Sequence, residues 1–408
     1  MNIHEQWVIQ NLIYSSASHL TSIERSNFGK RVEFHGDYRN TKPVITGWVK
    51  REYLKNIERI LDSGRLILGE YTRKFEESVR QYSDSKYAVA LSSATAAIEI
   101  ILKYLDVEGK EVIMPSNTFI SPVYAVKNAK GKVVLCDINL EDFNLDLTSL
   151  RNAVTPKTKV VLITYIAGRI PDNIFEIKEF CDENDLYLIE DASHAFGATI
   201  NGYKAGTIGF AGVFSMYPTK IVTSATGGVI TSDDIDLIKY CELLRHHGNE
   251  NGAVNQVLSG DMLLSEFNAL LGYLQVQEAY GMIQVRQEIF SFYKENLKDI
   301  FLEHGLYFQA SSDHNISSFY KIIVMSKSKE QCETFKKHLK ESHINTGHCY
   351  GVPLHLQPTL LEEYPLASLP NADRFRESHF TLPCHLDLSD DDLKYIVAKC
   401  KQAVEHGD

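Results

Sequence analysis

Short apolar runs alternate with amphipathic segments over most of this chain. Several runs are rich in Val, Ile and Leu, and they have the length of buried strands: 87–93, 111–115, 132–138, 160–166, 186–191, 211–217 and 227–232. Segments 94–105 and 174–185 carry apolar positions at helical spacing between such runs. Strands that alternate with helices predict an α/β fold, in which helices cover both faces of a mainly parallel sheet.

The pattern changes near residues 250–260. Long helices are predicted over 264–304, followed by mixed α+β structure and a C-terminal helix from Asp390. The N-terminal residues are rich in polar and aromatic side chains and lack a clean period. We therefore predict three parts, namely an N-terminal extension over 1–43, a large domain over 44–255 and a smaller C-terminal α+β domain over 256–408.

Composition narrows the class of protein. The 408 residues are 44% hydrophobic and 23% charged, which is typical of a soluble globular protein. A net charge of -11 argues against nucleic acid as the main partner. The sequence shows no signal peptide and no apolar run of bilayer length. Its seven scattered cysteines form no CxxC pair, so we expect no structural zinc and a reducing, cytoplasmic location.

Ligands of such sheets sit beyond the carboxyl ends of the strands, so the residues there are the first candidates for a site. Ser93, Ala94 and Thr95 follow the first strand at the start of a helix, where free backbone N–H groups favour a phosphate. The alternative is an ordinary helix cap. Phe119 follows the next strand and could stack on a planar ring; the alternative is a core phenylalanine.

Three ionisable residues follow later strands. Asp191 ends an apolar run, where a carboxylate needs a cation, unless it caps a helix over "ASHAFGA". His194 comes three residues later and could equally be a satisfied structural histidine. Lys220 lies in the apolar turn of "SMYPTKIVTSATGG", where it either extends to solvent or works in a pocket.

Pyridoxal 5'-phosphate (PLP) explains these features together. Its aldehyde requires a lysine amine, which Lys220 would supply, and its protonated pyridine nitrogen requires a carboxylate, which Asp191 would supply. Phe119 would cover one face of the ring, and the helix start at 93–95 would hold the phosphate. Each signal is weak alone, but their combination in one α/β domain predicts a PLP enzyme.

The chain also resembles a known family, the DegT/StrS group of nucleotide-sugar aminotransferases among the fold-type-I PLP enzymes. The resemblance covers roughly residues 43–400 and rests on "VIMPSNTFISPVYAV", "LIEDASHAFGA", "FSMYPTK" with "GG", "SEFNALLGYLQ", "GVPLHLQP" and "LPCHLDLSDDDL". It implies a homodimer. We expect the enzyme to move an amino group from an amino acid, L-glutamate, to a nucleotide-linked keto-sugar.

The resemblance also implies residue roles. Lys220 would hold the cofactor aldehyde, Asp191 would pair with the pyridinium, and His194 would lie near the ring phenolate oxygen. Phe119 would stack on the ring. The phosphate would be held by a group of three residues, Ala94, Thr95 and Ser215.

Three positions depart from the family pattern. Ile221 follows the lysine where the family often has Asn, and Asp261 stands where a family Asn reaches the neighbouring subunit's cofactor phosphate. We expect Asp261 to be turned away from that phosphate, because like charges repel. Arg169 is an added arginine that could face a carboxylate or phosphate, or lie on the surface.

Two other functions are considered. Some relatives are PLP-dependent sugar dehydratases, but these carry histidine in place of the lysine, and Lys220 argues against that reaction. A non-catalytic regulatory or structural protein on the same fold is the other alternative. The Lys220 and Asp191 pair argues against it, whereas the changed region around Asp261 favours it.

Overall fold

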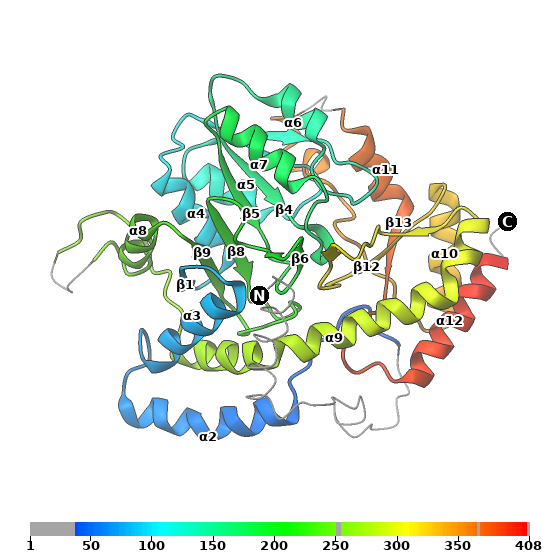
Figure 1. Ribbon diagram of the computed structural model, residues 1–408, viewed down its shortest axis with the longest axis horizontal. Coiled ribbons are helices and arrows are strands. Elements are labelled where there is room, and N and C mark those ends of the chain that lie inside the picture. The colour runs from blue at the N-terminus through cyan, green and yellow to red at the C-terminus, as the bar shows by residue number, and fades with distance from the viewer. Residues whose placement is uncertain (1–36, 250–253, 365–367, 406–408) are drawn as a thin grey trace, which may run out of the picture.

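The computed structural model describes residues 37–249, 254–364 and 368–405 (Figure 1). A seven-stranded sheet forms its centre, in the order β1-β9-β8-β5-β4-β2-β3. Its strands are β1 (Tyr87–Leu91), β2 (Glu111–Pro115), β3 (Lys132–Cys136), β4 (Thr158–Thr164), β5 (Tyr187–Asp191), β8 (Ala211–Ser215) and β9 (Gly228–Ser232). Only β9 runs antiparallel to its neighbours, so the predicted mainly parallel sheet is confirmed.

Alternate residues of the strands enter two separate hydrophobic clusters, one on each face of the sheet. In β4, Val161 and Ile163 pack in one cluster, and Val160 and Leu162 in the other. This follows from the two-residue period of a strand. The second cluster includes α4 (Ala94–Tyr104), α5 (Ser121–Asn128) and α8 (Ile235–Arg245); the first includes α2 (Gly47–Ser63), α3 (Glu70–Ser83), α6 (Leu147–Ala153) and α7 (Ile174–Glu183).

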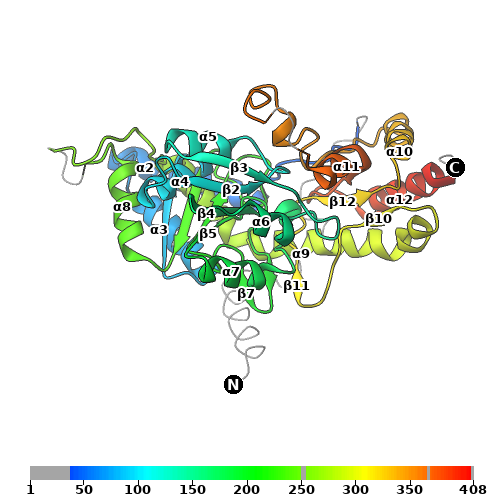
Figure 2. The same cartoon turned by 90° about the horizontal axis from the view of Figure 1, so that it is seen from above.

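One long helix, α9 (Glu266–Glu303), joins the two ends of the molecule (Figure 1). It packs against α2 and α3 near the large sheet and against β10 (Tyr307–Phe308) and α12 (Asp390–Glu405) at the other end. Figure 2 shows α10 (Lys329–Glu341) and α12 at one end of an elongated molecule, with α8 at the other. Because α9 contacts both parts, the domain boundary at 255/256 stays a prediction.

A small antiparallel sheet forms the centre of the C-terminal part. Its order is β10-β12-β13, with β12 at Ile322–Met325 and β13 at His379–Leu382. Helix α11 (Pro370–Ser378) leads into β13. A second small sheet, in the order β11-β6-β7, joins Asn315–Ile316 to the strands Thr199–Ile200 and Tyr203–Lys204. Both parts of the chain therefore meet beside the segment that precedes β12.

The predicted extension over 1–43 lies largely outside the described residues. Its last residues run beside the small sheet: Tyr38 forms a parallel bridge with Ile344, and the carbonyl of Asn40 accepts from the Cys384 amide at 3.3 Å. Among the described residues, no helix is both long and apolar enough to span a bilayer.

Candidate active site

Lys220 lies in the turn that follows β8. Its amide donates to the carbonyl of Tyr217 at 2.9 Å, and its side chain is half-buried. The amine lies over the ring of Tyr320, 4.9 Å from the centroid. Burial lowers the pKa of Lys220 to about 8, although the charge of Asp191 opposes the shift. A lysine with this pKa is neutral in about a tenth of molecules at pH 7, so it can act as a nucleophile and a base.

Asp191 and Glu190 end β5 on opposite faces of the sheet. The carboxylate of Glu190 is fully buried and accepts from the amides of Gly206, Ile208 and Gly209 at 2.6–2.7 Å. Asp191 is 5% exposed and accepts from the amide of one residue, Ser193, at 3.1 Å. Burial raises the pKa of Asp191. Among the described residues, Ser193 alone donates to this carboxylate, and a buried charge needs more donors than one residue supplies.

The segment after Asp191 is not a helix. Residues 192–198 form turns, so the alternative role of Asp191 as a helix cap is wrong. These turns bury His194, which is 5% exposed. Its Nε2 lies 3.0 Å from the Tyr350 hydroxyl, whereas its Nδ1 is buried and has no hydrogen-bond partner in the part of the chain that the structure describes. Burial, followed by the charges of Lys220 and Lys321, lowers the pKa of His194 well below its usual value. The ring is thus neutral and only half satisfied.

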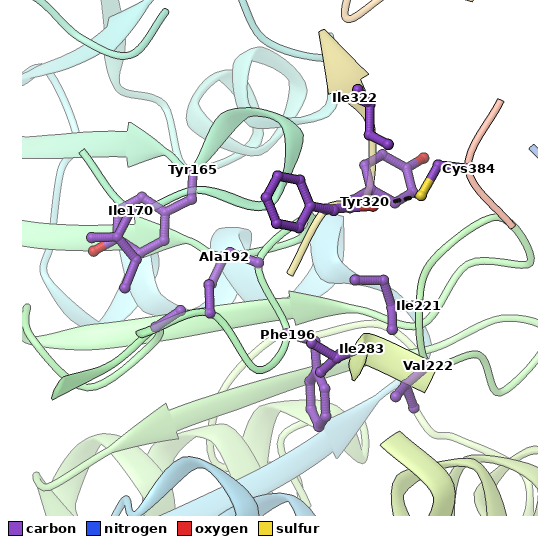
Figure 3. Close-up of a cluster of buried hydrophobic side chains, with 14 of the residues drawn as sticks. Tyr165, Ile170, Ala192, Phe196, Ile221, Val222, Ile283, Tyr320, Ile322 and Cys384 are labelled. Atoms are coloured by element: carbon purple, nitrogen blue, oxygen red, sulfur yellow. Dashed lines mark hydrogen bonds between the residues drawn. The ribbon is translucent and has the colours of Figure 1, made fainter. Parts of the chain in front are cut away.

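Tyr320 connects the histidine to the lysine. The ring of His194 stacks on Tyr320 with a centroid distance of 4.3 Å, and the Tyr320 hydroxyl lies 3.1 Å from that of Thr219. Figure 3 shows Tyr320 beside Cys384 and Ile221, above the apolar side chains that support the turn after β8. A tyrosine from the C-terminal part therefore fixes the positions of two candidate residues in the large domain.

The start of α4 has the features of an anion site. Ser93 caps the helix, since its hydroxyl accepts from the Ala96 amide at 3.1 Å, so the helix-cap interpretation is also correct. In the described part of the chain, no group accepts from the amides of Ala94 and Thr95. Gly228 packs closely here, because a Cβ on it would lie 2.4 Å from the Ala94 nitrogen. The absence of a side chain at Gly228 thus allows β9 to approach this helix start.

Two other candidates lie on the surface of the single chain. Phe119 is 55% exposed, so its alternative role as a core residue is wrong. Its ring centroid lies 6.1 Å from that of Tyr350. Ser215 is half-buried at the end of β8, and its hydroxyl accepts from the Tyr217 amide at 3.4 Å.

The departures from the family pattern have distinct surroundings. Arg169 is 1% exposed and binds both oxygens of Asp172 at 2.6 and 2.8 Å, so it is not a surface arginine. Ile221 is buried in the hydrophobic cluster of Figure 3. Asp261 is exposed, and its carboxylate accepts from the amide of Leu263 at 3.1 Å.

Tyr320 and Tyr350 are the neighbours of the site that sequence reasoning missed. Tyr350 directly precedes the segment "GVPLHLQP", but its backbone adopts φ 65°, a conformation that the sequence does not predict for a tyrosine. Tyr320 lies in "SSFYK", which carries no motif. Both residues belong to the C-terminal part of the chain, so they are not among the residues that follow the strands of the large sheet.

Comparison with known proteins gives matches along most of the chain. The model of the DegT/DnrJ/EryC1/StrS aminotransferase family matches residues 49–401. An uncharacterised protein of Methanocaldococcus jannaschii is 30% identical over 89% of this chain and 97% of its own. GDP-perosamine synthase of Escherichia coli O157:H7 is 26% identical over 87% and 95%. The solved PLP form of Spr1654 from Streptococcus pneumoniae has a TM-score of 0.82 at 26% identity, covering 91% and 99%.

Proposed function

Because this chain belongs to the DegT/DnrJ/EryC1/StrS aminotransferase family and is a PLP-dependent sugar aminotransferase, we propose that it moves the amino group of L-glutamate to a nucleotide-linked keto-sugar. The predicted family, fold-type-I class and cofactor are thereby confirmed. The GDP-linked product named for the Escherichia coli relative supports a nucleotide-linked acceptor. Amino-sugar biosynthesis, for a polysaccharide or a natural product, is the proposed setting.

The residues present fit PLP. Several polar groups of the candidate site have no hydrogen-bond partner among the described residues, and PLP carries groups that can pair with them. The buried carboxylate of Asp191 can accept from a cationic donor, and Nδ1 of His194 has no hydrogen-bond partner among the described residues. The free amides of Ala94 and Thr95 fit a phosphate, to which Ser215 would contribute its hydroxyl. Phe119 offers an exposed ring face. These complementary groups support the site assignments.

PLP supplies an aldehyde that condenses with amines and a pyridinium ring that accepts electrons. Asp191 would hold the proton on the pyridine nitrogen, since a buried carboxylate stabilises a cation beside it. Lys220 would take the proton from the donor α-carbon and return it at the C4' carbon of the cofactor, because a pKa of about 8 suits both transfers near neutral pH. Tyr350 and Tyr320 would hold the neutral ring of His194 in its orientation.

The single observation that carries this proposal is the placement of a half-buried Lys220, with a pKa lowered to about 8, near the carboxylate of Asp191. Half-reaction spectroscopy tests it. The purified protein should absorb in the near-ultraviolet to violet, and L-glutamate should shift this band; a keto-sugar from a panel of nucleotide-linked candidates should restore it. Lys220→Ala is the control that should show no shift. Absence of a shift in wild type with any amino donor would refute the proposal.

A further inference from the structure

A second lysine faces the ring that contacts Lys220. The amine of Lys321 lies 5.7 Å from the centroid of Tyr320, compared with 4.9 Å for Lys220. Lys321 is half-buried, and it donates to the Asn40 side-chain oxygen at 2.6 Å and to the Thr41 hydroxyl. Both acceptors are neutral. Within the described ranges, no carboxylate lies within ion-pairing distance of this amine.

The surroundings of Lys321 add positive charge. Arg286 is 4% exposed and donates to the carbonyls of Phe319 and Cys384 at 3.2 and 2.9 Å, again without a carboxylate among the described residues. A partly buried cation without a counter-charge is unfavourable, unless a ligand supplies the anion. The positive charges of Lys321 and Arg286 therefore favour the binding of an anionic group close to Lys220.

Lys321 is also held in place. The side-chain amide of Asn40, whose oxygen accepts from Lys321, donates in turn through its nitrogen to the carbonyl of Thr381 at 2.8 Å. The backbone amide of Lys321 donates to the carbonyl of Ala167 at 3.2 Å, which ties the start of β12 to the large domain. A lysine has three N–H donors, and Asn40 and Thr41 use two of them. No other described residue accepts from this amine, so its third donor can bind a ligand.

We propose that Lys321 binds the α-carboxylate of the amino donor and of the keto acid formed from it. This inference rests on the proposed function, in which the donor amine takes the place that Lys220 holds on the cofactor. In an amino acid the carboxylate carbon lies about 2.5 Å from the nitrogen. The phosphates of a nucleotide-linked sugar are separated from the reacting carbon by sugar-ring atoms. The amine of Lys321 faces the Tyr320 ring, as Lys220 does, so it is better placed for the donor carboxylate than for the phosphates of a nucleotide-linked sugar.

Two substitutions and a matched control separate this role from general charge effects. Lys321→Gln removes the charge but can still donate to Asn40, and Lys321→Arg keeps the charge. Lys42→Gln is the control: it removes one positive charge from the same segment as Asn40 and Thr41, but from an amine already paired with Asp387. Cofactor content and thermal melting identify any variant that fails to fold.

Binding of a non-reacting carboxylate provides the first measurement. Glutarate, titrated calorimetrically into the PLP-loaded protein, should bind Lys321→Gln at least roughly tenfold more weakly than wild type, because a charge-assisted hydrogen bond is lost. Lys321→Arg should recover much of the affinity, and Lys42→Gln should match wild type. Equal affinity for glutarate in Lys321→Gln and wild type would overturn the proposal.

The second measurement combines half-saturation by L-glutamate with the binding of UDP, a ligand that carries phosphates. The L-glutamate concentration that gives half-maximal conversion should rise by a similar factor in Lys321→Gln, and UDP should bind the variant and wild type equally. Loss of UDP affinity with unchanged glutarate affinity would assign Lys321 to the nucleotide instead and overturn the proposal. If glutarate binding depends on Lys321 but no amino acid shifts the spectrum, the carboxylate site stands and the transaminase proposal fails.

Discussion

Glu190 and Asp191 are adjacent carboxylates with different surroundings. Successive side chains of a strand point to opposite faces of the sheet. The carboxylate of Glu190 accepts from three backbone amides on one face, whereas Asp191 faces the candidate site and accepts from one backbone amide. The first carboxylate is already satisfied by the protein. The second is not, and this difference favours Asp191 over Glu190 for the proposed cofactor role.

Asp191→Asn should retain PLP and lose most turnover, because a neutral amide no longer keeps the pyridine nitrogen protonated. The cofactor-free variant should melt at or above the wild-type temperature, since burial already disfavours the charged carboxylate, as its raised pKa indicates. Steady-state assays, cofactor absorbance and thermal melting measure these quantities. Near-normal turnover would mean that Asp191 has only a structural role.

The lowered pKa of Lys220 predicts a pH dependence. In cofactor-free protein, the rate at which an amine-specific reagent labels Lys220 should rise with pH and level off, with a midpoint near 8 rather than near the usual lysine value of 10.5. The sign follows from the reactive form, which is the neutral amine present above the pKa. Peptide-resolved labelling from pH 6 to 11 measures the midpoint, and a midpoint above 10 would show that Lys220 is solvated.

The residues of the site differ in how far the sequence could predict them. Phe119, Asp191 and Lys220 follow strand ends, and apolar runs locate strand ends well. The positions of Tyr320 and Tyr350 depend on how the C-terminal part packs on the large sheet. That packing arises from contacts between residues far apart in the chain, which local hydrophobic patterns do not encode.

At the scale of elements, the boundaries of most predicted strands and helices agree with the structure within a few residues. Helices α2 and α3, before the first strand, were not predicted. The stability of α3 depends partly on a contact from elsewhere: the carboxylate of Glu266, at the start of α9, accepts from the amides of Gly69, Tyr71 and Thr72 at 2.8–2.9 Å. The segment "SEF" belongs to the family pattern, but that pattern does not predict the contact of Glu266 with the start of α3.

The contact between β9 and the start of α4 gives an element-scale prediction. Gly228→Ala would place a Cβ 2.3 Å from the Ser93 carbonyl carbon, so one element must move. Overpacking of this kind costs about 1–3 kcal/mol, and displacement of the helix start should weaken PLP binding. Thermal melting and cofactor titration measure the two effects.

Gly260→Ala is the matched control, because a Cβ at Gly260 meets no atom within 4 Å. It should leave both the melting temperature and the PLP affinity near wild type. If Gly228→Ala binds PLP as tightly as the control does, the start of α4 does not hold the phosphate.

At the scale of the whole molecule, we propose that two chains form the active unit. Leu258 is 95% exposed and Val254 68% exposed in the segment that leads to Asp261, and clustered apolar exposure of this kind favours a covering partner. A homodimer is the commonest closed assembly. Sedimentation should therefore show a dimer, and a fully active monomer would exclude it.

Asp261 tests what this segment does in the dimer. Its carboxylate accepts from its own segment, at the Leu263 amide, which is compatible with a side chain turned away from the partner's phosphate. Asp261→Asn should then bind PLP at least as tightly as wild type, because it removes a negative charge. Cofactor titration measures this affinity. A clearly weaker complex would mean that Asp261 makes a needed contact.

The identity of the lysine that holds PLP is the central claim, and covalent mapping tests it most directly. Borohydride reduction of the PLP-loaded protein fixes the cofactor to the amine that carries it, and peptide mass spectrometry then locates that amine. We predict the label on Lys220 and its loss in Lys220→Ala. A label on another residue, such as Lys321, or continued turnover by Lys220→Ala, would contradict the account.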